Sequence, residues 1–169
     1  MIGARLSDLI RIRAASSHDA AAIWAILEPI IRSGETYALP RDMSRAEALA
    51  YWCAPGNEVF VAEYGDRIVG TYLLRANQPG GGNHVANCGY MTSPAAQGRG
   101  VARRMLEHSL ERAKLRGFRA MQFNFVVSAN ERAVKTWHQA GFETVGVLPG
   151  AFDHPKLGFV DALVMFRTL

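Results

Sequence analysis

The chain has 169 residues, of which 49% are hydrophobic and 20% charged, so it fits one globular domain and excludes a disordered segment. Two cysteines, Cys53 and Cys88, are too few for a disulfide framework and favour the cytoplasm. The five histidines lack the spacing of metal ligands, and no stretch is typical of a signal peptide or a membrane span, so we expect neither a metal nor a membrane partner. The net charge of +4 favours an anionic partner.

The first third of the chain predicts one strand and two helices. Residues 10–14 alternate between apolar side chains and arginines, as a half-buried strand does. A helix capped by Ser17 should follow, and Pro29 should kink or end it. A second helix should begin with a capping box between Ser44 and Glu47.

The remaining chain predicts strands interleaved with two further helices, one at 101–117 and one that a capping box at Ser128 should open. Phe123 and Phe125 share one face of their strand and are expected in the core. This order predicts a single mixed α/β domain over residues 1–169, with helices on both faces of a central sheet. The expected strands are 58–64, 67–76, 84–93, 120–128, 143–152 and 158–168.

A cluster of glycine and arginine residues marks the start of the helix at 101. Residues 94–106 read PAAQGRGVARRML, so Gly98, Gly100 and three arginines meet where the positive end of the helix dipole disfavours cations. An anion between the arginines and the free backbone N–H groups would reverse that effect, and the glycines would let it approach the backbone. A tight turn with solvent-exposed arginines is the alternative.

These residues carry a resemblance to a known family. Gln97-Gly98-Arg99-Gly100-Val101-Ala102 matches the Gln/Arg-x-x-Gly-x-Gly/Ala signature of the GNAT superfamily of N-acetyltransferases. Three further segments resemble motifs of this family and follow in the same order along the chain: Tyr90-Met91-Thr92-Ser93-Pro94 before the signature, and Asn130-x-x-Ala133 and Gly141-Phe142 after it. The resemblance implies the GNAT acyl-CoA-binding fold, with a mostly antiparallel sheet. Among its branches, the chain is most similar to the phosphinothricin acetyltransferase-like group, which acetylates small amines and amino-acid analogues.

The resemblance implies acetyl-CoA as the acetyl donor. Its pantetheine arm would pair with the backbone of Tyr90, Met91 and Thr92, where N–H groups would also polarise the thioester carbonyl. Asn130 would contact the pantetheine from the other side, and Trp137 would border it. The diphosphate would lie on the signature turn, which consists of Gln97, Gly98, Arg99, Gly100, Val101, Ala102 and Arg103.

The expected catalytic groups depart from the family pattern. Trp137 stands where many members have a tyrosine, and its indole cannot donate a proton; the usual strand glutamate is also missing. Glu35 and His84 are the candidate bases, although each also fits an ordinary loop residue, and a relay through water is the third option. Candidates for contacts with the acceptor are Tyr37, Asn87 and Asn124.

The sequence therefore predicts an acetyl-CoA-dependent N-acetyltransferase for a small-molecule primary amine or amino-acid-like acceptor. The resemblance also allows a homodimer. A protein or peptide N-acetyltransferase and a non-catalytic acyl-CoA-binding module are the alternatives. Nucleic-acid binding is not expected, because the arginines are scattered and lack interleaved aromatic residues.

Overall fold

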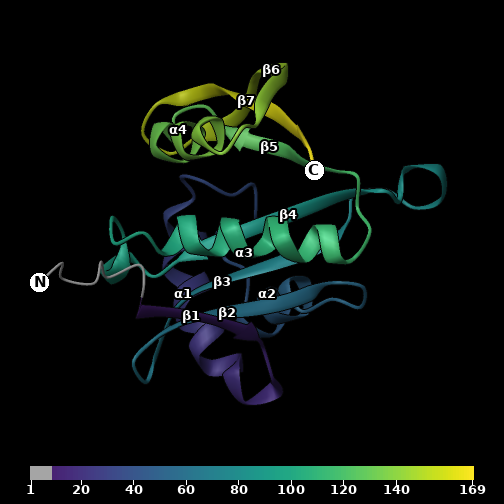
Figure 1. The fold of residues 1–169 in the computed structure, drawn as a ribbon. Coiled ribbons are helices and arrows are strands. Elements are labelled where there is room, and N and C mark those ends of the chain that lie inside the picture. The colour runs from purple at the N-terminus through teal and green to yellow at the C-terminus, as the bar shows by residue number, and fades with distance from the viewer. Residues whose placement is uncertain (1–8) are drawn as a thin grey trace, which may run out of the picture.

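The computed structural model describes residues 9–169, and a seven-stranded sheet forms the centre of this part of the chain (Figure 1). The strand order is β1-β2-β3-β4-β5-β7-β6, and every neighbouring pair is antiparallel except β4 with β5. The prediction of a mixed, mostly antiparallel sheet is confirmed. The strands are β1 (Ile10–Ala14), β2 (Glu58–Tyr64), β3 (Arg67–Ala76), β4 (Val85–Thr92), β5 (Ala120–Val127), β6 (Glu143–His154) and β7 (Gly158–Thr168).

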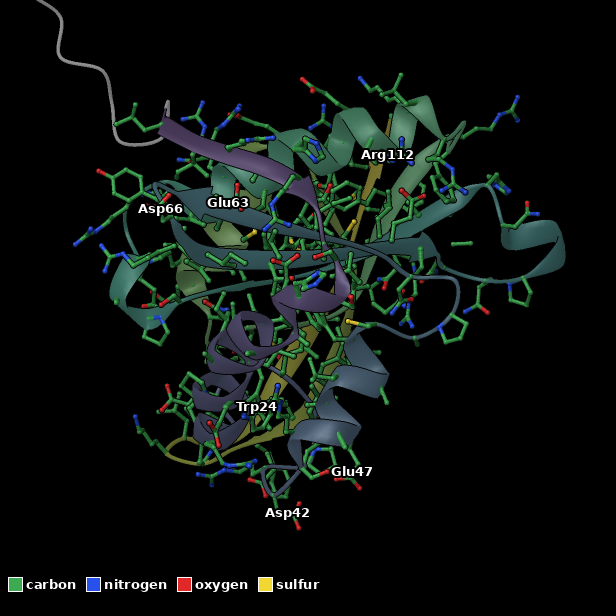
Figure 2. All side chains as sticks on the ribbon, turned by 90° about the horizontal axis from the view of Figure 1, so that it is seen from below. Trp24, Asp42, Glu47, Glu63, Asp66 and Arg112 are labelled. Atoms are coloured by element: carbon green, nitrogen blue, oxygen red, sulfur yellow. The ribbon has the colours of Figure 1, made fainter. Side chains whose placement is uncertain are left out.

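Helices cover both faces of the sheet, with α1 and α2 on one side and α3 on the other (Figure 2). Successive strand residues point to opposite faces, so β3 supplies Leu73 to the core under α1 and α2 and Tyr72 to the core under α3 and α4. No helix among residues 9–169 combines the length and apolar character needed to cross a membrane. The helices are α1 (Ala20–Ser33), α2 (Arg45–Trp52), α3 (Val101–Leu115) and α4 (Glu131–Gln139).

The first helix begins later than the sequence predicts, and Pro29 does not end it. Ser16, and not Ser17, precedes a 3-10 turn at Ser17–Asp19, and α1 starts at Ala20. Pro29 lies inside α1, which continues for four more residues to Ser33. A proline removes one helical hydrogen bond, but here buried side chains on both sides of it, including Ile26 and Ile31, hold the helix against the sheet.

The two predicted capping boxes have different outcomes. Ser44 caps α2, since its hydroxyl accepts from the backbone N–H of Glu47 and the Glu47 carboxylate accepts from the backbone N–H of Ser44. The box at Ser128 is wrong, because the Asn130 side chain caps α4 by accepting from the backbone N–H of Ala133. Because asparagine is as good an N-cap residue as serine, the spacing alone did not distinguish Asn130 from Ser128 as the cap of α4.

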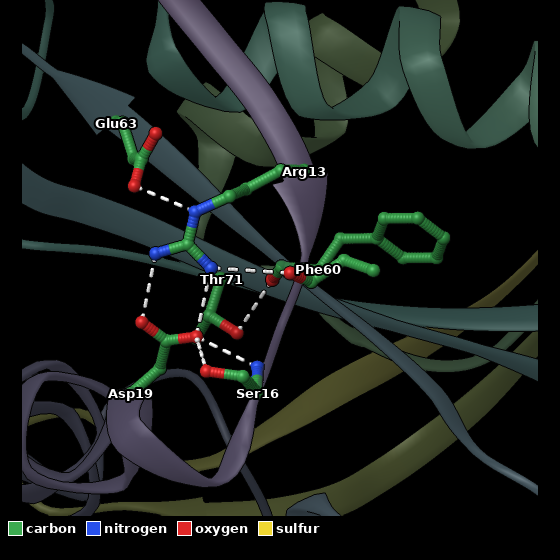
Figure 3. A network of polar contacts seen from close by, with 7 residues as sticks. Arg13, Ser16, Asp19, Phe60, Glu63 and Thr71 are labelled. Atoms are coloured by element: carbon green, nitrogen blue, oxygen red, sulfur yellow. Dashed lines mark hydrogen bonds and ion pairs between the residues drawn. The ribbon is translucent and has the colours of Figure 1, made fainter.

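A network of charged groups joins β1, β2 and the start of α1 (Figure 3). The Arg13 guanidinium donates two 2.8 Å hydrogen bonds to the Asp19 carboxylate and one of 2.7 Å to Glu63. Hydrogen bonding from Arg13 holds the pKa of the buried Asp19 carboxyl well below its usual range, in spite of the opposing effect of burial. This bidentate pair fixes the beginning of α1 against the sheet.

Candidate active site

A cleft opens where β4 and β5 separate. The two strands pair in parallel only at Val85 and Ala86, opposite Ala120 and Met121, and the ladder goes no further. Beyond that point they border a cavity of about 670 Å³, which α3, α4 and the segment after α1 also line. The cavity has the size of an ordinary small-molecule site.

One edge of β4 offers its backbone groups to this cleft. The bonds from Asn77 N to Val85 O and from Ser93 N to Val69 O frame an unbroken antiparallel register between β3 and β4. Because hydrogen-bonded pairs alternate in such a register, Asn87, Gly89 and Met91 pair with β3. The N–H and C=O groups of the intervening residues therefore point to the other edge, into the cleft; these residues are Cys88, Tyr90 and Thr92.

This geometry refines the expected pantetheine contacts. Tyr90 and Thr92 present their backbone to the cleft, as predicted, and Cys88 does so as well. Met91 also lines the cleft, but its backbone groups are turned toward β3 and its side chain is buried under α1 and α2, which argues against the predicted backbone contact. A two-residue alternation in backbone direction decides this, and only the register reveals it.

The signature turn is open at the start of α3. Gly98 and Gly100 have φ values of 76° and 82°, in the left-handed region that favours glycine, and Gly100 is the N-cap residue. No acidic residue lies in the first helical turn, so its backbone N–H groups are available to an anion. Gln97, Gly98, Gly100, Val101, Ala102 and Arg103 line the cleft.

The arginines beside this turn have only part of their charge neutralised. Arg103 and Arg104 share Glu107, at 3.0 and 3.2 Å, one helical turn further along α3. Arg99 is exposed and is not among the residues that line the cleft. Within residues 9–169, two arginines against one glutamate leave a positive field at a helix start, as a site for a diphosphate requires.

Helix α4 forms the opposite wall. The Trp137 ring lies 5.2 Å from that of Tyr90 and 5.1 Å from that of Phe123, measured between ring centroids, and it borders the cleft. Trp137 is buried, which agrees with its expected role as a wall. Asn130 also lines the cleft, although its side-chain oxygen is engaged in capping α4.

The segment after α1 lines the cleft on the face of the sheet that α1 and α2 cover. Glu35 in this segment forms a 2.5 Å ion pair with Lys156, from the loop between β6 and β7. The hydrogen bond from Lys156 lowers the pKa of the Glu35 carboxyl, which makes it a weaker base than an ordinary glutamate. The Glu35 carboxylate, a candidate base, is therefore already engaged by the ammonium group of Lys156.

Tyr37 lies two residues further along the same segment and reaches β4. Its hydroxyl donates a 2.9 Å hydrogen bond to the backbone carbonyl of Tyr90. Its ring packs edge-on against Trp52, with 6.3 Å between centroids. Burial raises the pKa of the Tyr37 phenol, so the group keeps its proton and acts as a donor.

Asn87 and Asn124 have partners within the protein. The Asn87 side chain is buried and donates to the carbonyl of Gln122, 2.9 Å away, so it joins β4 to β5 at the end of their ladder. Asn124 donates to the Asn77 side chain at 2.7 Å. Both residues line the cleft, but their amide groups are already used to shape it.

His84 does not lie at this site. It is exposed in the turn before β4 and borders a separate depression, together with Glu58 and Arg116. The cleft begins beyond Ala86, where β5 diverges. The structure therefore separates His84 from the expected catalytic centre, because a strand carries successive residues about 3.3 Å further away.

Several cleft residues carry no signal that singles them out in the sequence, among them Arg75, Tyr51 and Phe125. Arg75, near the end of β3, is half-buried, borders both the cleft and the depression at His84, and forms no ion pair with an acid in the part of the chain that the structure describes. Tyr51 on α2 lines the cleft beside Trp52. Phe125 was expected in the core but is 37% exposed, because a register irregularity between Phe123 and Val126 turns it out of the sheet.

The site is built from backbone groups, arginines and aromatic rings, and it offers no ligand set for a metal. Within residues 9–169, no group of three or more histidine, cysteine, aspartate or glutamate side chains is arranged to hold a metal ion. The open helix start and the free edge of β4 fit the two ends of an acyl-CoA: a diphosphate and an amide-containing arm.

Comparison with known proteins agrees with this geometry. The model of the acetyltransferase (GNAT) family matches residues 23–142. The chain is 37% identical to a GCN5-related N-acetyltransferase from Kribbella flavida, with a TM-score of 0.92 over 96% of this chain and 99% of that chain. It is 25% identical over 154 residues to N-acetyltransferase aca1 from Schizosaccharomyces pombe, which covers 79% of this chain and 72% of aca1. A GNAT superfamily phosphinothricin acetyltransferase from Sinorhizobium meliloti, in complex with AcCoA, has a similar fold, with a TM-score of 0.82 and 22% identity over 95% of this chain and 89% of that chain.

Proposed function

Since the chain belongs to the GNAT acetyltransferase family and is an acetyl-CoA-dependent acyltransferase, we propose that its acceptor is a small primary amine that also carries a carboxylate, as an amino acid does. This matches the phosphinothricin acetyltransferase-like branch expected from the sequence. Arg75 carries the proposal.

The charges at the acceptor end favour such a molecule. Arg75 lies on the α1–α2 face of β3, opposite Asn87 in the register, and its guanidinium is free of an acidic partner within residues 9–169. A guanidinium binds a carboxylate through two parallel hydrogen bonds, and in a partly dry cleft this is among the stronger polar contacts. Glu35, by contrast, is neutralised by Lys156.

Apolar and aromatic side chains surround these charges. Tyr37, Tyr51, Trp52 and Phe125 line the cleft, together with Ile30 and Leu39. This lining suits a compact acceptor with an apolar part. It suits a lysine of a protein substrate less well, because such a lysine is flanked by polar backbone.

The donor is held by the two features described above. The signature turn would bind its diphosphate and the free edge of β4 its amide-containing arm, and the thioester supplies an activated acetyl group. The chain's own part is to orient the amine and to let its proton leave. Because Glu35 is paired with Lys156 and His84 lies elsewhere, we assign proton removal to water in the cleft.

Two further properties belong to this proposal. Both cysteines are free, which supports the cytoplasm as the location. A homodimer is supported by β6, an edge strand on which Val145, Val147 and Leu148 are 59%, 51% and 39% exposed, and by Phe159 on the paired strand β7, which is 78% exposed. Residues 144–152 carry no charged side chain, and the Asp161 carboxylate that borders them is bonded to the backbone N–H of Gly150, so this largely apolar surface suits contact with a second copy.

An acceptor panel tests the proposal. Thiol release from acetyl-CoA is measured with free amino acids, with the corresponding amino-acid amides, and with amines that lack the carboxylate. We expect turnover with one or more free amino acids and at least tenfold lower kcat/KM with the matching amide. Turnover with peptides or protein lysines but with no free amino acid would refute the proposal in favour of protein acetylation.

A further inference from the structure

One side chain connects the acceptor end of the cleft to the edge of β4 that faces the donor. The carbonyl of Tyr90 lies on that edge, because the register turns the backbone of Tyr90 away from β3. It is also the carbonyl that accepts the hydrogen bond from Tyr37. We infer that Tyr37 is a positioning residue for acetyl-CoA, acting through the Tyr90 carbonyl from the acceptor side of the sheet.

A carbonyl oxygen can take part in both interactions. It has two lone pairs, so the Tyr90 oxygen can accept from Tyr37 and from an amide of the pantetheine arm at once. The first bond fixes the direction of the carbonyl before the donor arrives. A group that is already held loses less freedom on binding, which favours affinity.

The surroundings of Tyr37 hold its hydroxyl in place. Its ring rests on Trp52, whose indole N–H donates to Thr71 at 3.0 Å, and the Thr71 hydroxyl donates in turn to the carbonyl of Phe60 at 2.9 Å. These groups are buried and fully bonded, so the ring has little freedom to move.

Gly89 makes room for this contact. A Cβ atom at Gly89 would lie 3.2 Å from the Tyr37 hydroxyl oxygen, closer than side-chain carbons normally approach, and at an ordinary 3.6 Å from Trp52. Any larger residue at this position would push the hydroxyl away from β4. The hydrogen bond from Tyr37 to β4 therefore depends on the absence of a side chain at Gly89.

The segment that carries Tyr37 also carries Glu35, which is tied to the β6–β7 loop through Lys156. The wall of the acceptor end is thus joined directly to a donor-binding carbonyl of β4.

The experiment measures binding of acetyl-CoA without any acceptor, so it is independent of the proposed acceptor. Isothermal titration compares the parent with Tyr37→Phe, which keeps the ring and removes the hydroxyl. The matched control is Tyr64→Phe, which removes a hydroxyl from β2 at a residue that does not line the cleft. We expect Kd to rise about threefold to tenfold in Tyr37→Phe, the range of one lost hydrogen bond, and to stay within twofold in the control.

A double-mutant cycle with Gly89→Ala separates positioning from general damage. Gly89→Ala alone should weaken acetyl-CoA binding to a similar degree, because it displaces the Tyr37 hydroxyl. In the Tyr37→Phe background it should have little further effect, since the contact is already gone. Additive losses in the double variant, or equal Kd values for Tyr37→Phe and Tyr64→Phe, would overturn the inference. Melting temperatures of all variants show whether the fold is retained.

Discussion

The side-chain amide of Asn87 donates a 2.9 Å hydrogen bond to the backbone carbonyl of Gln122, at the level where β4 and β5 part. The side chain takes the place of the next backbone rung, which the diverging strands can no longer form. It therefore marks the closed end of the cleft.

Replacement of Asn87 by alanine should destabilise the protein. The carbonyl of Gln122 would lose its partner near the core, so we expect the free energy of unfolding to fall by about 1–2 kcal/mol. Urea denaturation measures this change. Asn124→Ala is the control, because Asn124 bonds to another exposed side chain and its loss should cost less than 0.5 kcal/mol. Equal losses in the two variants would contradict the role of Asn87.

The glycine at the start of α3 has a matched counterpart at its other end. Gly100 has φ of 82° and Gly117 has φ of 80°, so alanine at either position should cost about 1 kcal/mol of stability through backbone strain. Only Gly100 lines the cleft. We expect Gly100→Ala to weaken acetyl-CoA binding at least tenfold and Gly117→Ala to leave it within twofold, as measured by titration calorimetry. Similar affinities for both variants would argue against a diphosphate at this turn.

Arg75 should determine recognition of the acceptor carboxylate. In Arg75→Met, KM for an amino-acid acceptor should rise at least tenfold, since a charge-assisted bidentate pair is lost, while KM for acetyl-CoA stays within twofold. Steady-state kinetics with each substrate varied in turn provides both values. Arg45→Met, which removes an exposed arginine outside the cleft, controls for net charge. An equal change in both Michaelis constants of Arg75→Met would place Arg75 on the donor.

The pH profile should follow the amine and not Glu35. Hydrogen bonding from Lys156 lowers the pKa of Glu35, so this carboxylate is ionised above its ordinary pKa and is protonated only as the pH falls below that range. Between pH 6 and 9 we therefore expect kcat/KM to rise with the fraction of neutral amine. Glu35→Gln should keep that shape, with a change in rate below about threefold. If kcat/KM of the parent changed near neutral pH and this change disappeared in Glu35→Gln, Glu35 would instead be the base.

The exposed apolar side chains of the last hairpin should set the oligomeric state. We expect the parent to be a dimer by light scattering coupled to gel filtration. A charge at the centre of the proposed interface, in Val147→Glu with Phe159→Glu, should yield a monomer. Leu115→Glu is the control, since Leu115 is 81% exposed on α3, which packs on β1, β3 and β4 and not on the edge strand β6. A monomeric parent would refute the homodimer.

Local patterns were sufficient for much of this fold. The strand at β1, the capping box at Ser44 and the helical spacing of buried residues in α3 are seen in the structure, although Ala14 is exposed where the alternation of β1 predicts burial. Each of these three features depends only on residues that are close together in the sequence. The same reasoning misjudged Ser17 and Ser128, because several adjacent polar residues can cap one helix and only the final backbone angles choose among them.

The sequence by itself determined the class of molecule and the location of the glycine turn, because Gly98 and Gly100 encode a backbone conformation that other residues avoid. Tertiary structure alone decided which groups meet in the cleft. It turned Met91 toward β3, paired Glu35 with Lys156, which is far away in the sequence, and removed His84 from the site. Such outcomes depend on register and on long-range packing, and neither leaves a pattern in neighbouring residues.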